Sequence, residues 1–214
     1  MSRRELKAER KWREILRSAA RAFKKKGYYA TTMEDIASEL LMTQGSLYYY
    51  FKSKEEILYA CHECSMEHIL GSLEWVSRAD APAAAKIRTL VEEHVGVLVD
   101  DLQGSAMALE FTALSEPYLQ RIVNMRDRYE AGLREIIRQG IEAGEFVPVN
   151  PRLSGFMILG AINWIARWFD PQGPLPPEAV AQHYGDLFLR ALGADPTGVR
   201  PLPRPAEAPR PRGG

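Results

Sequence analysis

Residues 43–46 read Thr-Gln-Gly-Ser, a short run of small or hydrogen-bonding side chains, and three tyrosines follow at 48–50. A glutamine can pair with adenine through both atoms of its amide, and a glycine lets the backbone approach DNA closely. Tyrosine hydroxyls and lysine ammonium groups bind phosphates, which set position but carry no sequence information. This chemistry favours contact with duplex DNA. The candidate contacts are Thr43, Gln44, Gly45, Ser46, Tyr48, Tyr49, Tyr50, Lys52 and Lys54.

Apolar side chains are interleaved with this polar run. We expect Leu47 and Phe51 to pack in the core rather than at DNA. Of the three tyrosines, we expect two to face the nucleic acid, because a tyrosine has an apolar body as well as a polar tip.

The charge of the chain is zero overall but unevenly distributed. Residues 1–54 hold 13 lysines and arginines against 6 acidic residues, a net charge of +7, which leaves −7 for the remainder. A basic first quarter is typical of a protein that meets a polyanion, because cations displace counterions from phosphates. A basic helix that only faces solvent has the same composition, so charge alone leaves both interpretations open.

Three predicted helices position the polar run. Apolar residues recur at helical spacing over 12–23, and the threonines at 31–32 cap a second helix of about two turns. Thr43 caps a third short helix, and a capping box at 53–56 opens a longer one that runs towards Leu73. Two short helices joined by a tight turn match a helix-turn-helix, in which the second short helix enters the major groove.

Two segments resemble the signature of the TetR family of transcriptional repressors: Thr-Thr-Met-Glu-Asp-Ile-Ala at 31–37 and Gly-Ser-Leu-Tyr-Tyr-Tyr-Phe-Lys-Ser-Lys-Glu at 45–55. The resemblance implies a homodimer on a palindromic operator of double-stranded DNA. One position departs from the family pattern, because Leu41 stands between the short helices where a glycine is common. A leucine is sterically tolerable there and can change the angle between the helices. The DNA contacts implied by the resemblance are Thr32, Gln44, Ser46, Tyr48, Tyr49 and Lys54.

The remainder of the chain predicts further helices, because helical periodicity continues over 87–141 and recurs at about 151–169 and 177–192. The predicted fold is all-α with about nine helices. Its expected parts are a helix-turn-helix DNA-binding domain at 1–53, a helical ligand-binding and dimerisation domain at 54–193, and a tail at 194–214. The tail is rich in proline and arginine, and we expect it to be disordered rather than to recruit a partner.

The segment 161–177 is similar to a TetR branch whose members regulate fatty-acid or steroid breakdown and respond to acyl-CoA thioesters. Residues 126–130 and 144–149 are similar to that branch too. The resemblance implies an acyl-CoA effector and no cofactor. Regulation of an efflux pump, with another hydrophobic compound as effector, is the alternative within the family.

An acyl chain requires an apolar tunnel, and the CoA phosphates require cations at its mouth. Tryptophan and methionine at helical spacing are also typical of an ordinary core, and arginine of an ordinary surface, so a plainer role stays open for each candidate. The candidates for the tunnel are Met107, Phe111, Met125, Trp164 and Trp168, and those for the phosphates are Arg121, Arg126, Arg128 and Arg167.

The last two predicted helices have apolar faces suited to a four-helix contact between subunits. Dimerisation places the DNA-reading helices of the two subunits one turn of DNA apart. We expect a ligand in the tunnel to shift the helix that begins at Ser53 and so release DNA, which requires tighter binding to the DNA-incompetent state. The residues of the apolar faces are Leu153, Phe156, Met157, Gly160, Val180, Leu187, Phe188 and Leu192.

Other classes of function find less support. The sequence has no nucleophile elbow, glycine-rich phosphate loop or metal-binding helix, so no catalytic residue is assigned, and a helical acyl-CoA-binding enzyme is the weaker alternative. A structural adaptor does not account for the basic first quarter. Cys61 and Cys64 lack the second ligand pair of a zinc site and are expected to be ordinary thiols, even with His68 nearby. No apolar stretch is long enough to span a bilayer and no secretory signal is evident, so we expect a cytoplasmic protein without a membrane partner.

Overall fold

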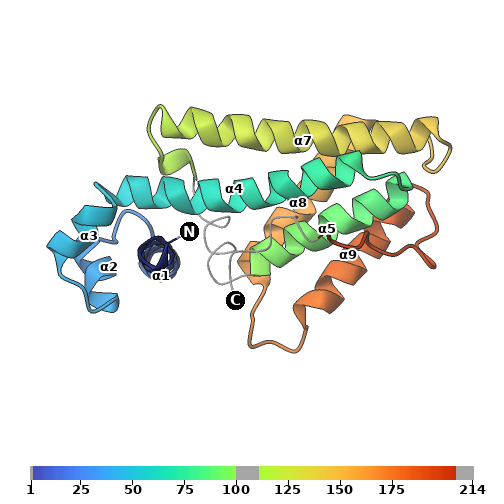
Figure 1. Ribbon diagram of the computed structural model, residues 1–214. Coiled ribbons are helices and arrows are strands. Elements are labelled where there is room, and N and C mark those ends of the chain that lie inside the picture. Colours follow the sequence, from blue (N-terminus) through green and yellow to red (C-terminus); the bar gives the residue numbers. More distant parts are fainter. Residues whose placement is uncertain (1, 100–110, 206–214) are drawn as a thin grey trace. The chain divides into compact units, whose positions relative to one another are not determined.

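The computed structural model describes residues 2–99 and 111–205 of the 214-residue chain (Figure 1). In these ranges every regular element is a helix, which confirms the predicted all-α fold, and eight α-helices with one 3₁₀ helix agree with the expected number. The helices are α1 (Arg3–Lys26), α2 (Met33–Glu39), α3 (Gln44–Tyr50), α4 (Lys54–Arg78), α5 (Ala83–Val99), η1 (Phe111–Ala113), α7 (Tyr118–Glu142), α8 (Pro151–Trp168) and α9 (Pro177–Ala191).

The chain divides into two compact units. Of the described residues, the first unit contains 2–65 and 111–122, and the second contains 66–99 and 123–205. Helices α4 and α7 each begin in the first unit and end in the second. The domain boundary expected after residue 53 therefore remains a prediction.

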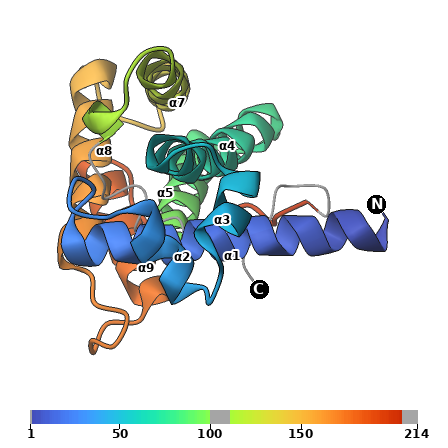
Figure 2. The ribbon, with the colours of Figure 1, turned by 90° about the vertical axis from the view of Figure 1, so that its left-hand side faces the viewer.

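The first unit is built on the apolar face of α1, which Figure 2 shows along its length beside α2 and α3. Leu16 and Phe23 of α1 are buried, α1 packs against α2, and α2 packs against α3. Ile36 and Leu47 contribute fully buried side chains from α2 and α3. Each such side chain stabilises the unit by roughly 1.5–3 kcal/mol, so the three helices form a firm support for exposed residues.

Side-chain caps determine where these three helices begin. Ser2 forms a capping box with Glu5 at the start of α1, and Thr32 forms another with Asp35 at the start of α2. The Thr43 hydroxyl accepts a hydrogen bond from the first turn of α3. Because an N-cap typically contributes about 1 kcal/mol, these caps favour the observed helix boundaries. The two threonine caps were predicted from the sequence, whereas the capping box at Ser2 was not.

Leu41, where the family commonly has glycine, ends α2 in a left-handed conformation with φ +53°. The N–H of Met42 donates to the Ala37 carbonyl at 2.9 Å, and the N–H of Leu41 donates to the Ser38 carbonyl at 3.1 Å. These two bonds form a Schellman motif, whose left-handed position favours glycine because a side chain there is crowded. The turn therefore keeps the geometry that a glycine would supply.

The second unit is organised around α5, which packs against α8 and α9. Most of its residues are buried, from Ala83 through Ile87 and Leu90 to Leu98. None of the helices in the described residues is both long and apolar enough to cross a membrane.

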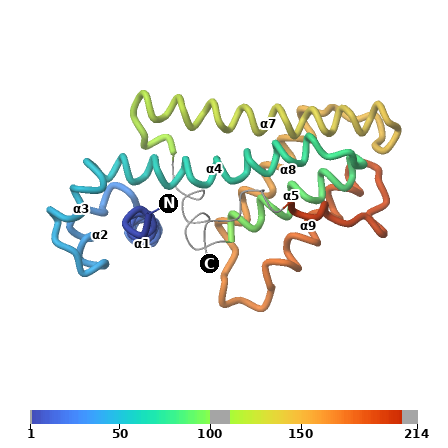
Figure 3. The backbone as a smooth tube through the Cα atoms, viewed as in Figure 1, coloured from blue at the N-terminus to red at the C-terminus, as the bar shows by residue number. Residues whose placement is uncertain are grey.

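A proline-rich segment follows α9 and runs back along α5 (Figure 3). The N–H of Leu202 donates to Oγ1 of Thr89 at 2.8 Å, and Arg204 forms an ion pair with Glu93. The expected disorder of the tail is therefore wrong for the part up to residue 205, because polar contacts to α5 hold it without much apolar burial. The rest of the predicted tail lies outside the described residues.

Candidate functional site

The N-terminal half of α3 presents a set of exposed polar groups. Gln44 and Gly45 are exposed, and no atom lies within 4 Å of the place where a side chain on Gly45 would begin. The hydroxyls of Thr43 and Ser46 lie 2.8 Å apart, and Thr43 Oγ1 accepts the N–H of Ser46 at 3.1 Å. This surface offers amide, hydroxyl and bare backbone groups to a base edge, which is the chemistry expected from the sequence.

The apolar residues around this surface are divided as the sequence predicts. Leu47 and Phe51 are buried in the first unit. Tyr49 is 78% exposed and Tyr48 is also exposed, whereas Tyr50 is half-buried with its ring 5.2 Å from that of Tyr49. Two tyrosine hydroxyls are therefore accessible next to the polar groups of α3.

Thr32 is exposed at the start of α2, but its side chain belongs to the capping box. Its N–H and hydroxyl both donate to Asp35 Oδ2 at 2.9 Å. These bonds and that of Lys26, whose Nζ lies 2.6 Å from Asp35 Oδ1, lower the pKa of the Asp35 carboxyl to about 2. A DNA contact by Thr32 therefore has to share a hydroxyl that already fixes α2.

Lys54 is placed differently from the prediction. Its Nζ donates to the carbonyl oxygens of Tyr28, Tyr29 and Thr31 at 3.0, 3.1 and 3.0 Å, and lies 4.7 Å from the centre of the Tyr28 ring. A lysine ammonium has three donors, and all three are used here. Lys54 thus joins α4 to the loop before α2. In this geometry the ammonium has no donor left for a phosphate, so the predicted phosphate contact is wrong.

The predicted effector residues that the structure describes are divided between the two units. In the first unit, the Phe111 ring packs edge-on against His62, and the exposed Arg121 hydrogen-bonds the Tyr59 hydroxyl. Met107 lies outside the described residues.

The predicted residues of the second unit are also dispersed. Met125 and Arg128 line a groove of about 760 Å³ between α4 and α7. Trp164 is 64% exposed, and Trp168 and Arg167 are exposed with it on α8. The expectation that the two tryptophans line a tunnel is therefore wrong, because they lie on an open face of the helix.

The exposed face of α8 is apolar along most of its length. It also includes Leu153, Phe156 and Met157, all predicted for a contact between subunits, and Leu187 is exposed on α9. The other predicted contacts on α9 are buried in their own subunit, because α9 turns that face toward α5. The contact predictions that are wrong for this reason are Val180, Phe188 and Leu192.

A buried polar cluster lies between α5, α7 and α8. Neither ring nitrogen of the buried His94 forms a hydrogen bond of good geometry within the described residues, although the Asn163 side chain lies close enough to act on the pKa of the ring. Burial and the nearby Arg126 guanidinium lower the pKa of His94 to about 3, so the ring is neutral. Asn163 approaches the ring, yet its Oδ1 also has no hydrogen-bond partner in the described chain, and the Tyr129 ring packs edge-on at 5.3 Å.

This cluster was not found from the sequence because His94, Arg126 and Asn163 are far apart along the chain, and residue type alone does not show that they meet. Buried polar atoms without partners cost about 1–3 kcal/mol each, and a ligand can recover that free energy. Of the predicted effector residues that the structure describes, Arg126, which is half-buried, contributes to the cluster.

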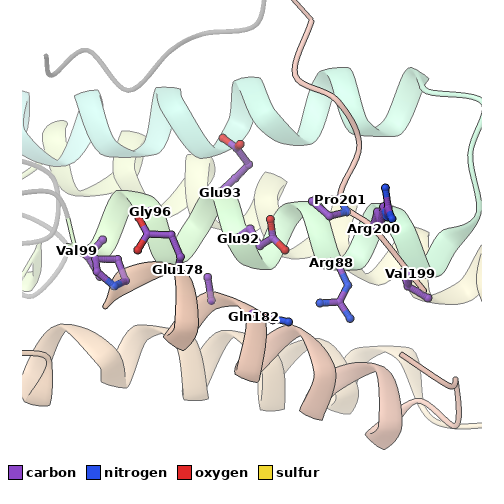
Figure 4. A pocket seen from close by; sticks show the side chains of 12 residues that line it. Arg88, Glu92, Glu93, Gly96, Val99, Glu178, Gln182, Val199, Arg200 and Pro201 are labelled. Atoms are coloured by element: carbon purple, nitrogen blue, oxygen red, sulfur yellow. The ribbon is translucent and has the colours of Figure 1, made fainter. Parts of the chain in front are cut away.

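An acidic groove of about 770 Å³ lies between α5, α9 and the segment after α9 (Figure 4). Glu92 of α5 and Glu178 of α9 line it, and neither forms a hydrogen bond or ion pair within the described residues. Burial raises the pKa of Glu92, whereas Arg88 is paired with Asp186. Arg200 also lines this groove, but Arg88 and Arg200 stand against three glutamates, so the groove offers phosphates no excess of positive charge.

No three potential metal-ligating side chains gather in the described part of the chain. Cys61 is buried with its Sγ 3.8 Å from the Leu16 carbonyl oxygen, and burial raises the pKa of this thiol. An uncharged buried thiol is a poor nucleophile and a poor metal ligand.

Comparison with known proteins decides the family. A family model described as bacterial regulatory proteins, tetR family, matches residues 15–61, and a model described as tetracyclin repressor-like, C-terminal domain, matches residues 80–192. The second match alone covers more than half of the chain. The chain belongs to the TetR family. The resemblance inferred from the two motifs is confirmed, and this TetR-family protein is a transcriptional regulator rather than an enzyme.

Similar proteins support the assignment over most of the chain. The HTH-type transcriptional repressor KstR2 of Mycobacterium tuberculosis is 30% identical over 198 residues, which cover 84% of this chain and 91% of KstR2. The crystal structure of the TetR-family regulator PfmR from Thermus thermophilus is 34% identical with a TM-score of 0.76 and covers 82% of this chain and 97% of its own. AibR in complex with isovaleryl coenzyme A and operator DNA is 26% identical with a TM-score of 0.73 and covers 82% and 96% of the two chains.

Proposed function

We propose that this TetR-family regulator is a homodimeric repressor that binds a palindromic operator through α3 and is released by an acyl-CoA thioester. The exposed row of Gln44, Gly45 and Ser46 on a firmly packed helix carries the DNA-binding part of the proposal. Tyr48 and Tyr49 supply hydroxyls to phosphates on either side of the bases that this row reads. The net charge of +7 over residues 1–54 is the electrostatic complement of the DNA backbone.

A selection from random duplexes, followed by fluorescence anisotropy, tests operator binding. Gln44→Ala is expected to weaken binding to the selected operator about 5- to 160-fold, because a bidentate base contact discriminates by about 1–3 kcal/mol. Its binding to random duplex is expected to stay nearly unchanged. Gln182→Ala, which alters an exposed glutamine of α9, is the control. Equal losses on operator and random duplex contradict base reading by Gln44.

The effector proposal rests on relatives together with the buried polar cluster. KstR2 is named a transcriptional repressor, and AibR was crystallised with isovaleryl coenzyme A. We place the thioester or the adjacent amide of the ligand at His94 and Asn163, because a neutral imidazole and an amide each offer a donor and an acceptor. Arg128 of the same unit remains a proposed contact to the CoA phosphates, since it is an exposed cation.

Release from DNA follows if the ligand binds the DNA-incompetent state more tightly than the bound one. Helix α4 is suited to transmit the change, because it runs through both units as one helix.

The effector is tested by adding long-chain acyl-CoA, the free acid or CoA alone to the operator complex. Release by acyl-CoA, but not by the free acid or by CoA alone, supports both a thioester effector and its proposed position at the buried polar cluster. If operator binding is tight and none of the three compounds changes it, the proposed repressor function stands and the proposed effector is rejected. Turnover of the thioester contradicts the regulator as a whole and favours an enzyme.

A further inference from the structure

Helix α1 begins twelve residues before the segment that matches the TetR family model, which starts at Ile15. This early part of α1 forms one wall of a groove of about 620 Å³, and the other wall is the end of α3. The α1 wall has four cations and one acid, and all lining residues lie within the first unit. The charged and aromatic lining residues are Arg4, Lys7, Arg10, Lys11 and Glu14 from α1, with Tyr49 and Tyr50 from α3.

The cations of this groove are largely uncompensated. Arg4, Lys7 and Arg10 are exposed and form no ion pair within the described residues, whereas Lys11 pairs with Glu14 at 3.0 Å. Further along α1, Arg21 lies 3.7 Å from a carboxylate of α2. A concave surface with three unpaired cations and one compensated cation attracts a polyanion more strongly than the same charges spread over a flat surface.

The wall of the groove is an ordered helix, because the capping box of Ser2 and Glu5 fixes its first turn. Residues 4, 7 and 11 follow the spacing that places side chains on one helical face. The helix rises about 15 Å from residue 4 to residue 14, which matches about four nucleotides along one DNA strand. The groove therefore has the length and charge to follow a stretch of backbone.

We propose that this groove binds the phosphodiester backbone of duplex DNA next to the bases that α3 reads. The inference rests on the proposed operator binding and extends it. Tyr49 belongs both to the exposed surface of α3 and to the groove, so the two contacts are continuous. Each protomer then contacts DNA over a longer stretch than the helix-turn-helix alone covers.

The test uses the full-length protein on a selected operator, with Arg4→Gln/Lys7→Gln as the variant. Lys24→Gln/Lys25→Gln is the matched control, because it removes the same charge from exposed, unpaired lysines at the other end of α1. Affinity is measured by fluorescence anisotropy from about 50 to 300 mM salt, a range over which phosphate contacts change affinity strongly, on a long duplex and on duplexes trimmed in steps from each end.

The groove variant is expected to bind the long duplex on the order of 10- to 60-fold more weakly than wild type at about 0.1 M salt, with the salt slope reduced by about 1.8, since each phosphate contact contributes about 0.9. Operator and random duplex are expected to lose affinity alike. As the duplex is trimmed, the affinity of wild type is expected to fall until it equals that of the groove variant. The affinity of the variant itself is expected to change little.

Equal effects of the two double variants, or equal sensitivity of wild type and groove variant to trimming, overturn the proposal and leave α1 as a solvated basic helix. Circular dichroism of both variants guards against a loss of helix. Failure of wild type to select any operator is a separate result, which rejects the proposed repressor itself.

Discussion

Leu41 shows how one residue carries strain at the centre of the DNA-binding unit. It is 97% exposed with φ +53°, so its side chain gains no packing to offset an unfavourable backbone conformation. A left-handed non-glycine residue costs roughly 1–2 kcal/mol. The hydrogen bonds of the turn hold it there because they cap the carbonyls of α2.

Leu41→Gly is expected to stabilise the protein by about 0.5–1 kcal/mol, since the strain it removes exceeds the extra entropy of glycine in the unfolded chain. Urea denaturation measures the change. Leu40→Gly is the control, because Leu40 has φ −92° and gains nothing from glycine. A loss of stability in Leu41→Gly contradicts strain at this turn.

His94 provides a second prediction at this scale, on pH. Its pKa of about 3 in the folded protein is below the ordinary value of 6.5. Stability is therefore complete above about pH 6.5 and is lost as pH falls towards about 3, because only the unfolded chain binds the proton in that window.

In His94→Leu this histidine contribution, about 1.4 kcal/mol per pH unit at most, is expected to vanish. The contribution is measured from the denaturation midpoints of wild type and His94→Leu between about pH 7 and pH 4, where the folded and unfolded chains bind different numbers of protons. If the two midpoints change in parallel with pH, His94 makes no such contribution. The same variant is expected to be as stable as wild type or more stable at neutral pH, because it removes unpaired buried polar atoms. It is also expected to respond less to acyl-CoA.

At the scale of elements, the first turn of α4 is tied to the loop between α1 and α2 by one side chain. The Lys54 ammonium donates hydrogen bonds to three backbone carbonyl groups of this loop, which lie outside any helix. Sequence motifs place this lysine correctly on α4, but its role depends on how α4 packs against the loop. The ammonium thus positions the helix-turn-helix.

Lys54→Met is expected to destabilise the protein by about 1–3 kcal/mol, because hydrogen bonds from a charged group are lost while the apolar stem remains. Thermal denaturation measures this loss. Lys52→Met is the control, since Lys52 is exposed. If Lys54→Met leaves the stability unchanged but lowers the salt slope of DNA binding by about 0.9, the result instead supports a phosphate contact by Lys54.

At the scale of the whole molecule, the open face of α8 points to a second copy of this chain. Trp164 and Leu153 are each 64% exposed, and Phe156, Met157 and Trp168 extend the same apolar face. Large apolar side chains gathered on one exposed face are typical of a contact between proteins. A family that binds palindromic DNA requires a symmetric partner, which such a face can provide.

Trp164→Glu is expected to convert the dimer to a monomer by sedimentation velocity at micromolar concentration and to reduce operator affinity strongly, because the DNA-reading helix of one subunit then binds without that of the other. Leu6→Glu, which places the same charge on an exposed apolar residue of α1, is expected to leave the dimer intact. A dimer that persists in Trp164→Glu assigns the contact to another surface.

Residue types and their spacing were enough to predict the helices of the first unit, the exposed polar run of α3 and the family, because caps, 3.6-residue periodicity and the motifs at 31–37 and 45–55 are local signals. The three-dimensional packing was needed to show that Lys54 joins backbone segments, that Trp164 is exposed and that His94 is buried without a hydrogen bond of good geometry among the described residues. It also decided that part of the predicted tail is bound to α5. These outcomes depend on which helices pack together, and residue type and spacing do not specify which face of an apolar helix meets a neighbour and which stays open.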